Sequence, residues 1–312
     1  MKKLFYSCMA FSLLAITSCQ KEEVVPPPTP TSNLSSYFSD NESDAKQTFT
    51  LDASTSQFFT GTNGVKIYMP ANAFVYSNGT TVTGSVTIEL TEVLTVSDMV
   101  KLGKTTASNG EVLVSGGQLN ITATQNGNAL TLAPGYALNV SVPVNSPDPQ
   151  MALFTGTQNS SGDVDWISAS VDSAQQDSII ITQDSSGGTW YNFDFDNDSL
   201  GWINCDYFWN TGQSQTTITA SLDTMFNSSN TACFLVFSNI NSVLNMYASS
   251  TAGIFTTINI PINQSVTFVC ISEIDNQYYS AFVSATTSLN HVENIDMTAT
   301  TLADIETAIN NL

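Results

Sequence analysis

The sequence predicts an all-β protein that ends in a short C-terminal helix. Apolar and polar residues alternate in many short runs, and turn residues separate these runs at short intervals. Only 11% of the 312 residues are charged, so Ser, Thr, Asn and Gln supply most of the polarity, which suits exposed sheet faces better than helices. We expect two β-sandwich-like domains after an export segment and a proline-rich tether.

The first sandwich domain is expected at 47–147. Its clearest strand lies within 82–94, where Val86, Ile88 and Leu90 share one face and threonines and glutamates occupy the other. A later strand ends at an Asn-Gly pair, which is a strong hairpin signal.

The second β-rich domain is expected at 148–312, with short apolar runs as far as 283. Only the C-terminus has a helical period. Thr301 and Asp304 resemble a capping box, and four apolar residues fall on one helical face: Leu302, Ile305, Ile309 and Leu312.

Residues 1–18 have the pattern of a signal peptide. Two lysines precede a mostly apolar stretch that is too short to be a permanent membrane-spanning helix. The sequence Ala-Ile-Thr-Ser-Cys at 15–19 resembles a lipobox, so Cys19 is expected to become the lipidated first residue. A flexible tether is expected at 19–46, because its prolines favour an extended polyproline II conformation.

The residues after Cys19 are similar to the export signal of Bacteroidetes-type surface lipoproteins: Gln20, Lys21, Glu22 and Glu23. The resemblance implies an outer-membrane protein that is lipid-anchored and faces the cell exterior. Its membrane contact would come through the lipid alone.

A second resemblance concerns the first domain. The segment 64–74, Gly-Val-Lys-Ile-Tyr-Met-Pro-Ala-Asn-Ala-Phe, and the segment 83–90, Thr-Gly-Ser-Val-Thr-Ile-Glu-Leu, resemble the opening of a ZU5-like β-sandwich. Met69 stands where an aliphatic residue usually precedes the proline. ZU5 modules are scaffolding and interaction domains, so the resemblance implies a role without catalysis.

The charge distribution is one-sided. All 7 basic residues are lysines and none follows Lys104, whereas 27 residues are acidic. Removal of residues 1–18 would leave 5 lysines against 27 carboxylates, a net charge of −22. Such a surface repels phosphate backbones, which excludes nucleic acid as a partner. It attracts divalent cations or basic partners, although acidity can also serve solubility alone.

Apart from the lipid acceptor Cys19, three cysteines remain after removal of residues 1–18: Cys205, Cys233 and Cys270. Cys233 and Cys270 lie in apolar, strand-like runs, so an inter-sheet disulfide and two buried free thiols are both open readings. Buried free thiols are favoured, and no cysteine spacing resembles a metal site.

Catalytic signals are sparse. His291 is the single histidine, and Glu293 lies two residues away, where a strand would place both side chains on one face. A lone histidine in a polar stretch is typical of a surface residue, and no hydrolase, metalloprotease or phosphate-loop motif occurs.

Paired carboxylates are the remaining route to catalysis, because a glycosidase needs only two across a cleft. Two such pairs are Glu89 with Glu92 and Asp163 with Asp165. A carbohydrate-active hydrolase is therefore the alternative to a binding protein.

An acidic and aromatic cluster spans 190–209. Asp194, Asp196 and Asp198 have the alternate spacing of calcium ligands, although the segment is no EF-hand. The competing reading is an acidic strand end with Phe193 and Phe195 facing the core.

The aromatic residues of this cluster could stack on sugar rings, although aromatics in strands more often belong to the core. The candidate glycan platform consists of Trp190, Tyr191, Trp202, Tyr207 and Trp209. Four Asp-Ser/Thr-hydrophobic triplets also resemble O-glycosylation sites of Bacteroidetes exported proteins, with acceptors Ser173, Ser178, Ser199 and Thr224.

The sequence thus favours a lipid-anchored surface protein with a binding or structural role toward a glycan, a protein or an envelope component. It indicates no cofactor apart from the calcium candidate, and no catalysis of its own.

Overall fold

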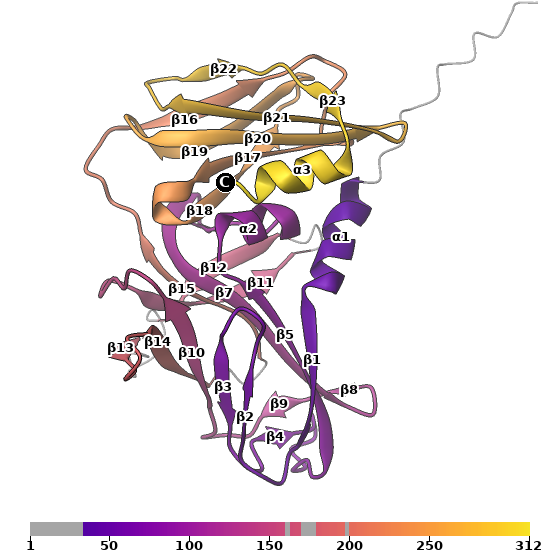
Figure 1. Ribbon diagram of the computed structural model, residues 1–312, viewed down its shortest axis with the longest axis vertical. Coiled ribbons are helices and arrows are strands. Elements are labelled where there is room, and N and C mark those ends of the chain that lie inside the picture. The colour runs from indigo at the N-terminus through magenta and orange to yellow at the C-terminus, as the bar shows by residue number, and fades with distance from the viewer. Residues whose placement is uncertain (1–33, 160–162, 170–178, 197–199) are drawn as a thin grey trace, which may run out of the picture. The chain divides into compact units, whose positions relative to one another are not determined.

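The computed structural model describes residues 34–159, 163–169, 179–196 and 200–312, all within one compact unit, Thr31–Leu312. The predicted all-β class is confirmed, since these residues form several sheets with three short helices (Figure 1). Within these ranges, none of the helices has the length and apolarity that crossing a membrane requires.

The first six-strand path forms one layer of a sandwich. Its order is β1 (Lys46–Asp52), β5 (Ser85–Val93), β7 (Glu111–Gln125), β15 (Gly201–Phe208), β11 (Ala152–Gln158) and β12 (Val164–Ser168). We call it the central sheet. Two short strands, β6 (Ala107–Ser108) and β8 (Asn128–Ala129), pair with β7.

The second layer has the order β13 (Ile180–Gln183), β14 (Thr189–Phe195), β10 (Leu138–Val144), β3 (Lys66–Met69) and β2 (Gln57–Thr60), and β4 (Phe74–Val75) pairs with β9 (Thr131–Leu132) nearby. The core between the layers contains Val86, Ile88 and Leu90, the face predicted by alternation. Phe193 and Phe195 are also buried there.

The expected division at 147/148 does not separate these sheets. Strands β11, β12 and β15 complete the central sheet, and β13 and β14 complete the second layer, although all five follow residue 148. The chain leaves the sandwich only after Phe208, because each layer needs strands from both halves of the segment 46–208.

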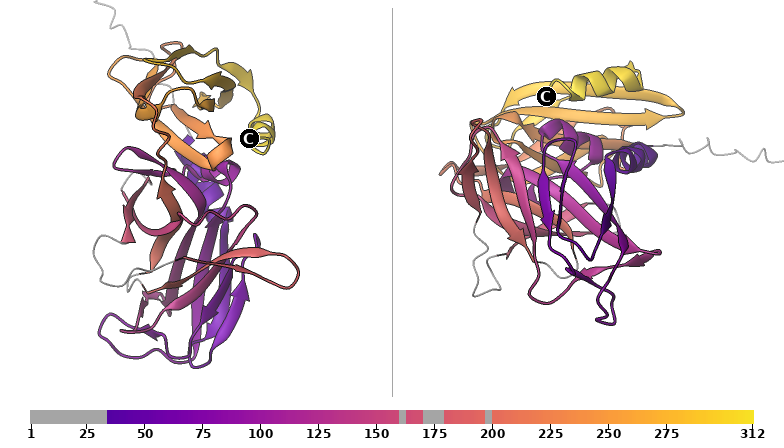
Figure 2. Two further views of the ribbon diagram at one scale, coloured as in Figure 1. Left: turned by 90° about the vertical axis from the view of Figure 1, so that its left-hand side faces the viewer. Right: turned by 60° about the horizontal axis from the view of Figure 1, so that its bottom comes forward.

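The remaining strands form a third, eight-stranded sheet, which we call the curled sheet (Figure 2). Its order is β22 (Val292–Asn294), β16 (Gln215–Ser221), β19 (Ile254–Pro261), β18 (Ser242–Ala248), β17 (Thr231–Phe237), β20 (Ser265–Ile274), β21 (Gln277–Thr286) and β23 (Thr298–Thr300). The end strands β22 and β23 are consecutive in sequence, so the sheet wraps around its own core, which includes Phe237, Phe255 and Phe268.

A third hydrophobic cluster joins the curled sheet to the outer face of the central sheet. It combines Trp166 and Trp202 of the central sheet with Phe234 and Val269 of the curled sheet. The helices α1 (Leu34–Asp44), α2 (Val96–Leu102) and α3 (Leu302–Ile309) contribute further buried residues to this cluster. The central sheet is therefore buried on both faces.

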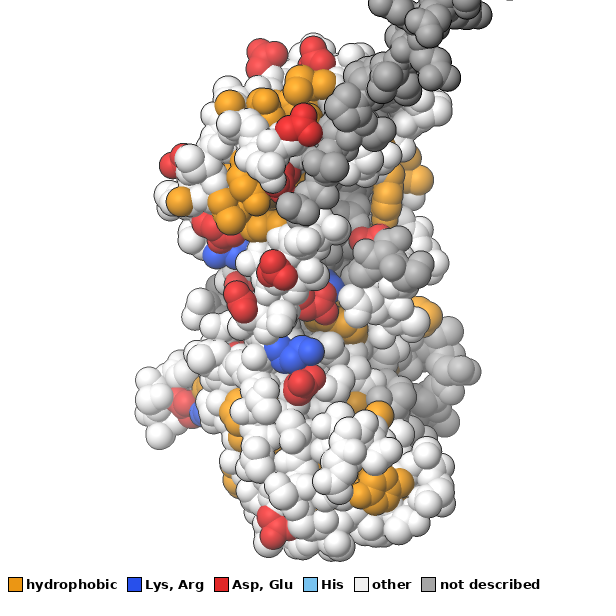
Figure 3. Space-filling model, turned by 90° about the vertical axis from the view of Figure 1, so that its right-hand side faces the viewer, with side chains coloured by type: hydrophobic (Ala, Val, Ile, Leu, Met, Phe, Trp, Pro, Cys, Tyr) orange, Lys and Arg blue, Asp and Glu red, His pale blue; other side chains and the backbone are white. Residues whose placement is uncertain are grey.

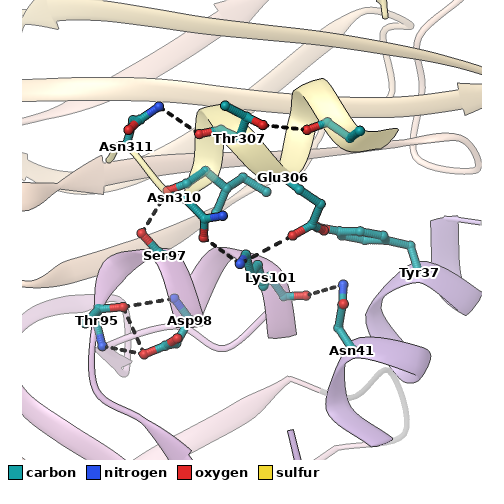
Figure 4. Close-up of polar contacts among 12 residues, drawn as sticks. Tyr37, Asn41, Thr95, Ser97, Asp98, Lys101, Glu306, Thr307, Asn310 and Asn311 are labelled. Atoms are coloured by element: carbon teal, nitrogen blue, oxygen red, sulfur yellow. Dashed lines mark hydrogen bonds and ion pairs between the residues drawn. The ribbon is translucent and has the colours of Figure 1, made fainter. Parts of the chain in front are cut away.

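The predicted C-terminal helix is confirmed in α3. Thr301 is its N-cap and accepts a hydrogen bond from the backbone amide of Asp304 at 3.2 Å. Ile305 and Ile309 are buried. Ser97 donates to the Ile309 carbonyl at 2.8 Å, which fixes α3 against α2 (Figure 4).

Helix α1 occupies residues that were expected to belong to the flexible tether. Its polar sequence has a weak apolar period, but Leu34 and Tyr37 are buried. The Tyr37 hydroxyl donates to Glu306 at 2.7 Å, and Lys101 pairs with the same carboxylate at 3.3 Å (Figure 4). Tertiary contacts with α2 and α3 thus stabilise a helix that propensity does not predict.

The surface on the α1 side shows the low charge of the sequence. Most of this face consists of uncharged polar groups and backbone, and acidic side chains outnumber lysines (Figure 3).

Glu92 provides a first stability prediction. Its buried carboxylate accepts hydrogen bonds from Gln47 Nε2 at 2.8 Å, from the Asn63 amide at 2.9 Å and from the Val65 amide at 2.9 Å. Glu92→Gln removes the charge and aims an amide at these donors. We expect a loss of about 3 kcal/mol in the free energy of unfolding by urea.

The matched control is Glu89→Gln on the same strand. Glu89 makes a partly exposed ion pair with Lys46 at 3.3 Å, so its loss should cost less than about 1 kcal/mol. Equal effects of the two substitutions would contradict the structural role of Glu92.

Asp206 provides a prediction about pH. Burial raises its pKa well above the ordinary value. Asn204 donates to its Oδ2 at 2.6 Å, and its Oδ1 has no hydrogen-bond partner among the described residues. Because the folded state holds this proton more tightly than the unfolded state, stability falls as pH rises from about 4 through the raised pKa.

Asp206→Asn should remove this pH dependence. At neutral pH the variant should be more stable than the parent by on the order of 1–3 kcal/mol, and the difference should vanish below pH about 4. Urea unfolding across pH measures both quantities, and a variant that is less stable at every pH would refute the assignment.

Candidate functional site

The candidate site is a cleft of about 550 Å³ between the sandwich and the curled sheet. It lies where β18 and β19 diverge. These neighbours pair only at Tyr247 with Thr256 and at Ala248 with Phe255, and then separate. The turn between β6 and β7 and the edge strand β12 form the other sides.

Five consecutive residues, 163–167, line the cleft, so β12 runs along its wall. Strand alternation places Asp163, Asp165 and Ile167 on one side of β12, whereas Val164 and Trp166 point into the core. The Trp166 indole donates to the Thr105 carbonyl at 2.7 Å, which fixes this strand against the segment before β6.

Large hydrophobic side chains are exposed around the cleft. Ile167 is 58% exposed, Tyr247 64% and Ile258 56%. They come from three strands, β12, β18 and β19, and all three line this one cavity. Clustering of exposed apolar side chains at a concave site is typical of ligand-binding surfaces.

The polar groups of the cleft are acidic or neutral. Asn245 donates to Asp163 Oδ1 at 3.0 Å. Partial burial raises the pKa of the Tyr247 hydroxyl, and the negative charge of Asp163, with a smaller effect of Asp165, raises it further. No lysine or histidine occurs among the described lining residues, so the site disfavours an anionic ligand.

A second hollow of about 440 Å³ adjoins the cleft and shares Asp163, Asn245 and Tyr247 with it. It extends toward α1 and Lys104. The buried Lys104 ammonium pairs with Glu42 at 2.8 Å and lies 5.2 Å from the ring centre of Trp202. The two hollows therefore meet at these three shared residues.

The structure does not assemble the predicted aromatic platform. Tyr191 and Trp202 are buried on different faces, and Tyr207 is partly buried. Trp209 packs on the curled-sheet core, and Trp190 lies on the outside of the second layer beneath Lys66. Trp202 is buried because the central sheet is covered on both faces. Its strand neighbours face the core of the sandwich, and Trp202 faces the curled sheet.

The predicted calcium ligands are only partly described. Asp194 accepts a hydrogen bond from Asn139 at 3.0 Å on the outside of β14, Asp196 is exposed, and Asp198 lies outside the described residues. Among the residues that the structure describes, no group of three or more His, Cys, Asp or Glu could hold a metal ion.

The two carboxylate pairs differ in their surroundings. Glu89 and Glu92 serve the fold, as their contacts above show, whereas Asp163 and Asp165 both line the cleft. His291 contacts Glu293 at 3.0 Å as expected, and Ser288 at 3.3 Å, but none of these three residues lines the cleft.

The three cysteines of the folded part are buried and free. Cys233 and Cys270 lie opposite each other on β17 and β20, within one sheet rather than between sheets. Thr224 is exposed in a turn after β16. The remaining predicted sites lie outside the described residues: Cys19, Gln20, Lys21, Glu22, Glu23, Ser173, Ser178 and Ser199.

Comparison with known proteins adds no assignment, because neither a family model nor a curated protein matches the chain. Sequence reasoning singled out Asp163 and Asp165 but missed Asn245, Tyr247 and Ile258. One signal could have identified Tyr247 and Ile258 as site residues. Both are large side chains on the exposed face of their strands, where a polar residue is usual.

The geometry of the cleft predicts a titration result. Asp163→Asn and Asp165→Asn should each lower the pKa of Tyr247 toward about 10, since a nearby negative charge disfavours the tyrosinate. Asp163 should have the larger effect. Ultraviolet titration, with the Tyr247→Phe spectrum subtracted, isolates this residue, and an unchanged titration in both variants would contradict the arrangement.

Proposed function

We propose that the chain is a lipid-anchored cell-surface binding protein without catalysis of its own, and that the cleft is its ligand site. The observation that carries this proposal is the convergence of exposed Ile167, Tyr247 and Ile258 on one acidic cavity. Exposed apolar residues also occur elsewhere, such as Phe58 and Leu289, but in the cleft three of them meet at one concave site, which is typical of a ligand-binding surface.

The proposed address rests on the N-terminal sequence. The lipobox at Cys19, the signal-like residues 20–23 and the proline-rich segment support export, lipidation and display on the outer membrane. The ZU5-like resemblance of 64–90 supports an interaction role. Helix α1 begins at Leu34, so the tether would connect directly to the helical cluster around α2 and α3.

A carbohydrate-active hydrolase is the second candidate, and Asp163 with Asp165 in the cleft is the observation in its favour. Two residues apart on one strand, their side chains are separated by roughly 7 Å, within the range that glycosidases use. Both nevertheless come from the same wall. The opposite wall contributes Asn245, Tyr247 and Thr256, so no described carboxylate there could complete a pair across a bound sugar. Binding is therefore favoured.

The test uses the full chain in detergent on panels of neutral polysaccharides and of linear peptides, with retention and release of reducing ends scored together. We expect saturable retention without release. Tyr247→Ala should weaken retention by about tenfold or more, because it removes the central exposed ring. Tyr136→Ala is the control, since Tyr136 is an exposed tyrosine remote from the cleft lining.

Release of reducing ends that disappears in Asp163→Asn would replace the binding proposal with the hydrolase. Retention that is indifferent to Tyr247→Ala would move the ligand site elsewhere on the protein.

A further inference from the structure

We infer that Cys233 and Cys270 form a disulfide within the curled sheet when the chain folds in an oxidising compartment. The structure describes both residues as free thiols, so the inference concerns their oxidation. Three features carry it: the register of the two strands, the contact between the two side chains, and the separate position of the third cysteine of the folded part.

The register places the two cysteines directly opposite each other. Cys233 on β17 pairs with Cys270 on β20 in an antiparallel ladder. The Glu273 amide donates to the Asn230 carbonyl at 3.1 Å, which makes these opposite residues of the same ladder a hydrogen-bonded pair. Such pairs alternate, so Cys233 and Cys270 form a non-hydrogen-bonded pair, whose Cα atoms lie about 4.5 Å apart. Disulfides span Cα separations of about 4.4 to 6.8 Å.

The two side chains point to the same side of the sheet and meet there. Both belong to the core of the curled sheet, where Cys233 is 2% and Cys270 0% exposed. Burial raises the pKa of the Cys233 thiol well above its ordinary value, and hydrogen bonding with the Cys270 thiol raises it further. Ala281 on β21 is the next residue opposite Cys270. This small neighbour lowers the steric cost of rotating the Cys270 side chain into disulfide geometry.

The third cysteine of the folded part lies elsewhere. Cys205 is buried in the core between the two layers of the sandwich, whereas Cys233 and Cys270 belong to the core of the curled sheet. Cys8 lies within residues 1–18, and Cys19 is the proposed lipid acceptor. One disulfide and one buried thiol therefore account for the odd number of cysteines after Cys19.

The oxidant is a disulfide donor, and glutathione disulfide is the probe for it. One cysteine thiolate attacks the donor, forms a mixed disulfide and releases one glutathione thiol. The second cysteine thiolate attacks the sulfur of the first, and the second glutathione leaves as a thiol. The two protein thiols lose two electrons and two protons, and the donor gains both. Because both thiols are buried once the sheet has closed, the exchange takes place during folding.

The disulfide closes a loop that contains part of the cleft. The segment between the two cysteines includes β18 and β19, which contribute Asn245, Tyr247 and Ile258 to the lining. The cross-link restricts this segment in the unfolded chain, so the oxidised protein is more stable than the reduced one. The inference rests on the proposed function only for the compartment, because exported proteins fold under oxidising conditions.

The experiment refolds the full chain from urea in detergent, either with glutathione disulfide and glutathione or with dithiothreitol. Remaining thiols are alkylated under denaturing conditions, and unreduced peptides are mapped by mass spectrometry. With glutathione disulfide we expect a cross-link between the peptides of Cys233 and Cys270, and an alkylated Cys205. The Tm of the oxidised form should exceed that of the reduced form by about 5 °C or more.

Two matched variants locate the effect, since each replaces a buried cysteine by a small apolar residue. Cys270→Ala should abolish the difference in Tm between the two refolding conditions, whereas Cys205→Ala should keep it. The comparison is made within each variant, so a loss of stability that the substitution itself causes does not enter. The peptide map of the unaltered chain gives a result even where a variant fails to fold.

Free thiols at Cys233 and Cys270 after refolding with glutathione disulfide, or a disulfide that includes Cys205, would overturn the inference. The same map of the chain isolated from its cells, with thiols alkylated at lysis, separates the inference from the proposed address. A reduced pair on a lipidated chain would overturn the inference. A reduced pair on a chain that retains residues 1–18 would contradict the proposed export, while the refolding result decides the inference.

Discussion

The structure depends on the burial of the central sheet on both faces. Its inner face packs against the second layer of the sandwich, and its outer face packs against the curled sheet and the three helices. This double burial explains why β7 and β15 are almost continuously buried, where a two-layer sandwich would alternate. It also buries polar groups: Asn204 donates to Asp206 Oδ2, whereas Asp206 Oδ1 has no hydrogen-bond partner among the described residues.

The cleft lies where the curled sheet no longer covers the edge of the central sheet. The central sheet ends at β12, and the curled sheet above it opens where β18 and β19 separate. An edge strand and a divergence in the neighbouring sheet therefore meet at one place. Sheet edges are normally protected by charge, by proline or by a covering segment, and here Asp163 and Asp165 provide the charge.

Local pattern predicted local structure well. The alternation at Val86, Ile88 and Leu90 identified a core face, and Thr301 with Asp304 identified the start of α3. The division at 147/148 was misplaced because Pro143 and Pro147 look like a terminus, whereas β10 continues into a sheet completed by β14. Trp202 was expected as a surface ring, since alternation cannot show that a second sheet covers the outer face. The cleft brings together residues 163–167, 245–247 and 256–258, and no local pattern connects segments so far apart.

Backbone amide hydrogen exchange, with and without a panel ligand that the chain retains, tests the central claim most directly. The account predicts that the ligand slows exchange in the segments that line the cleft, 163–167 and 256–258 with Asn245 and Tyr247, and leaves the amides of the second sandwich layer unchanged. Bound ligand that protects none of these segments, or that protects only distant strands, would contradict the cleft as the ligand site.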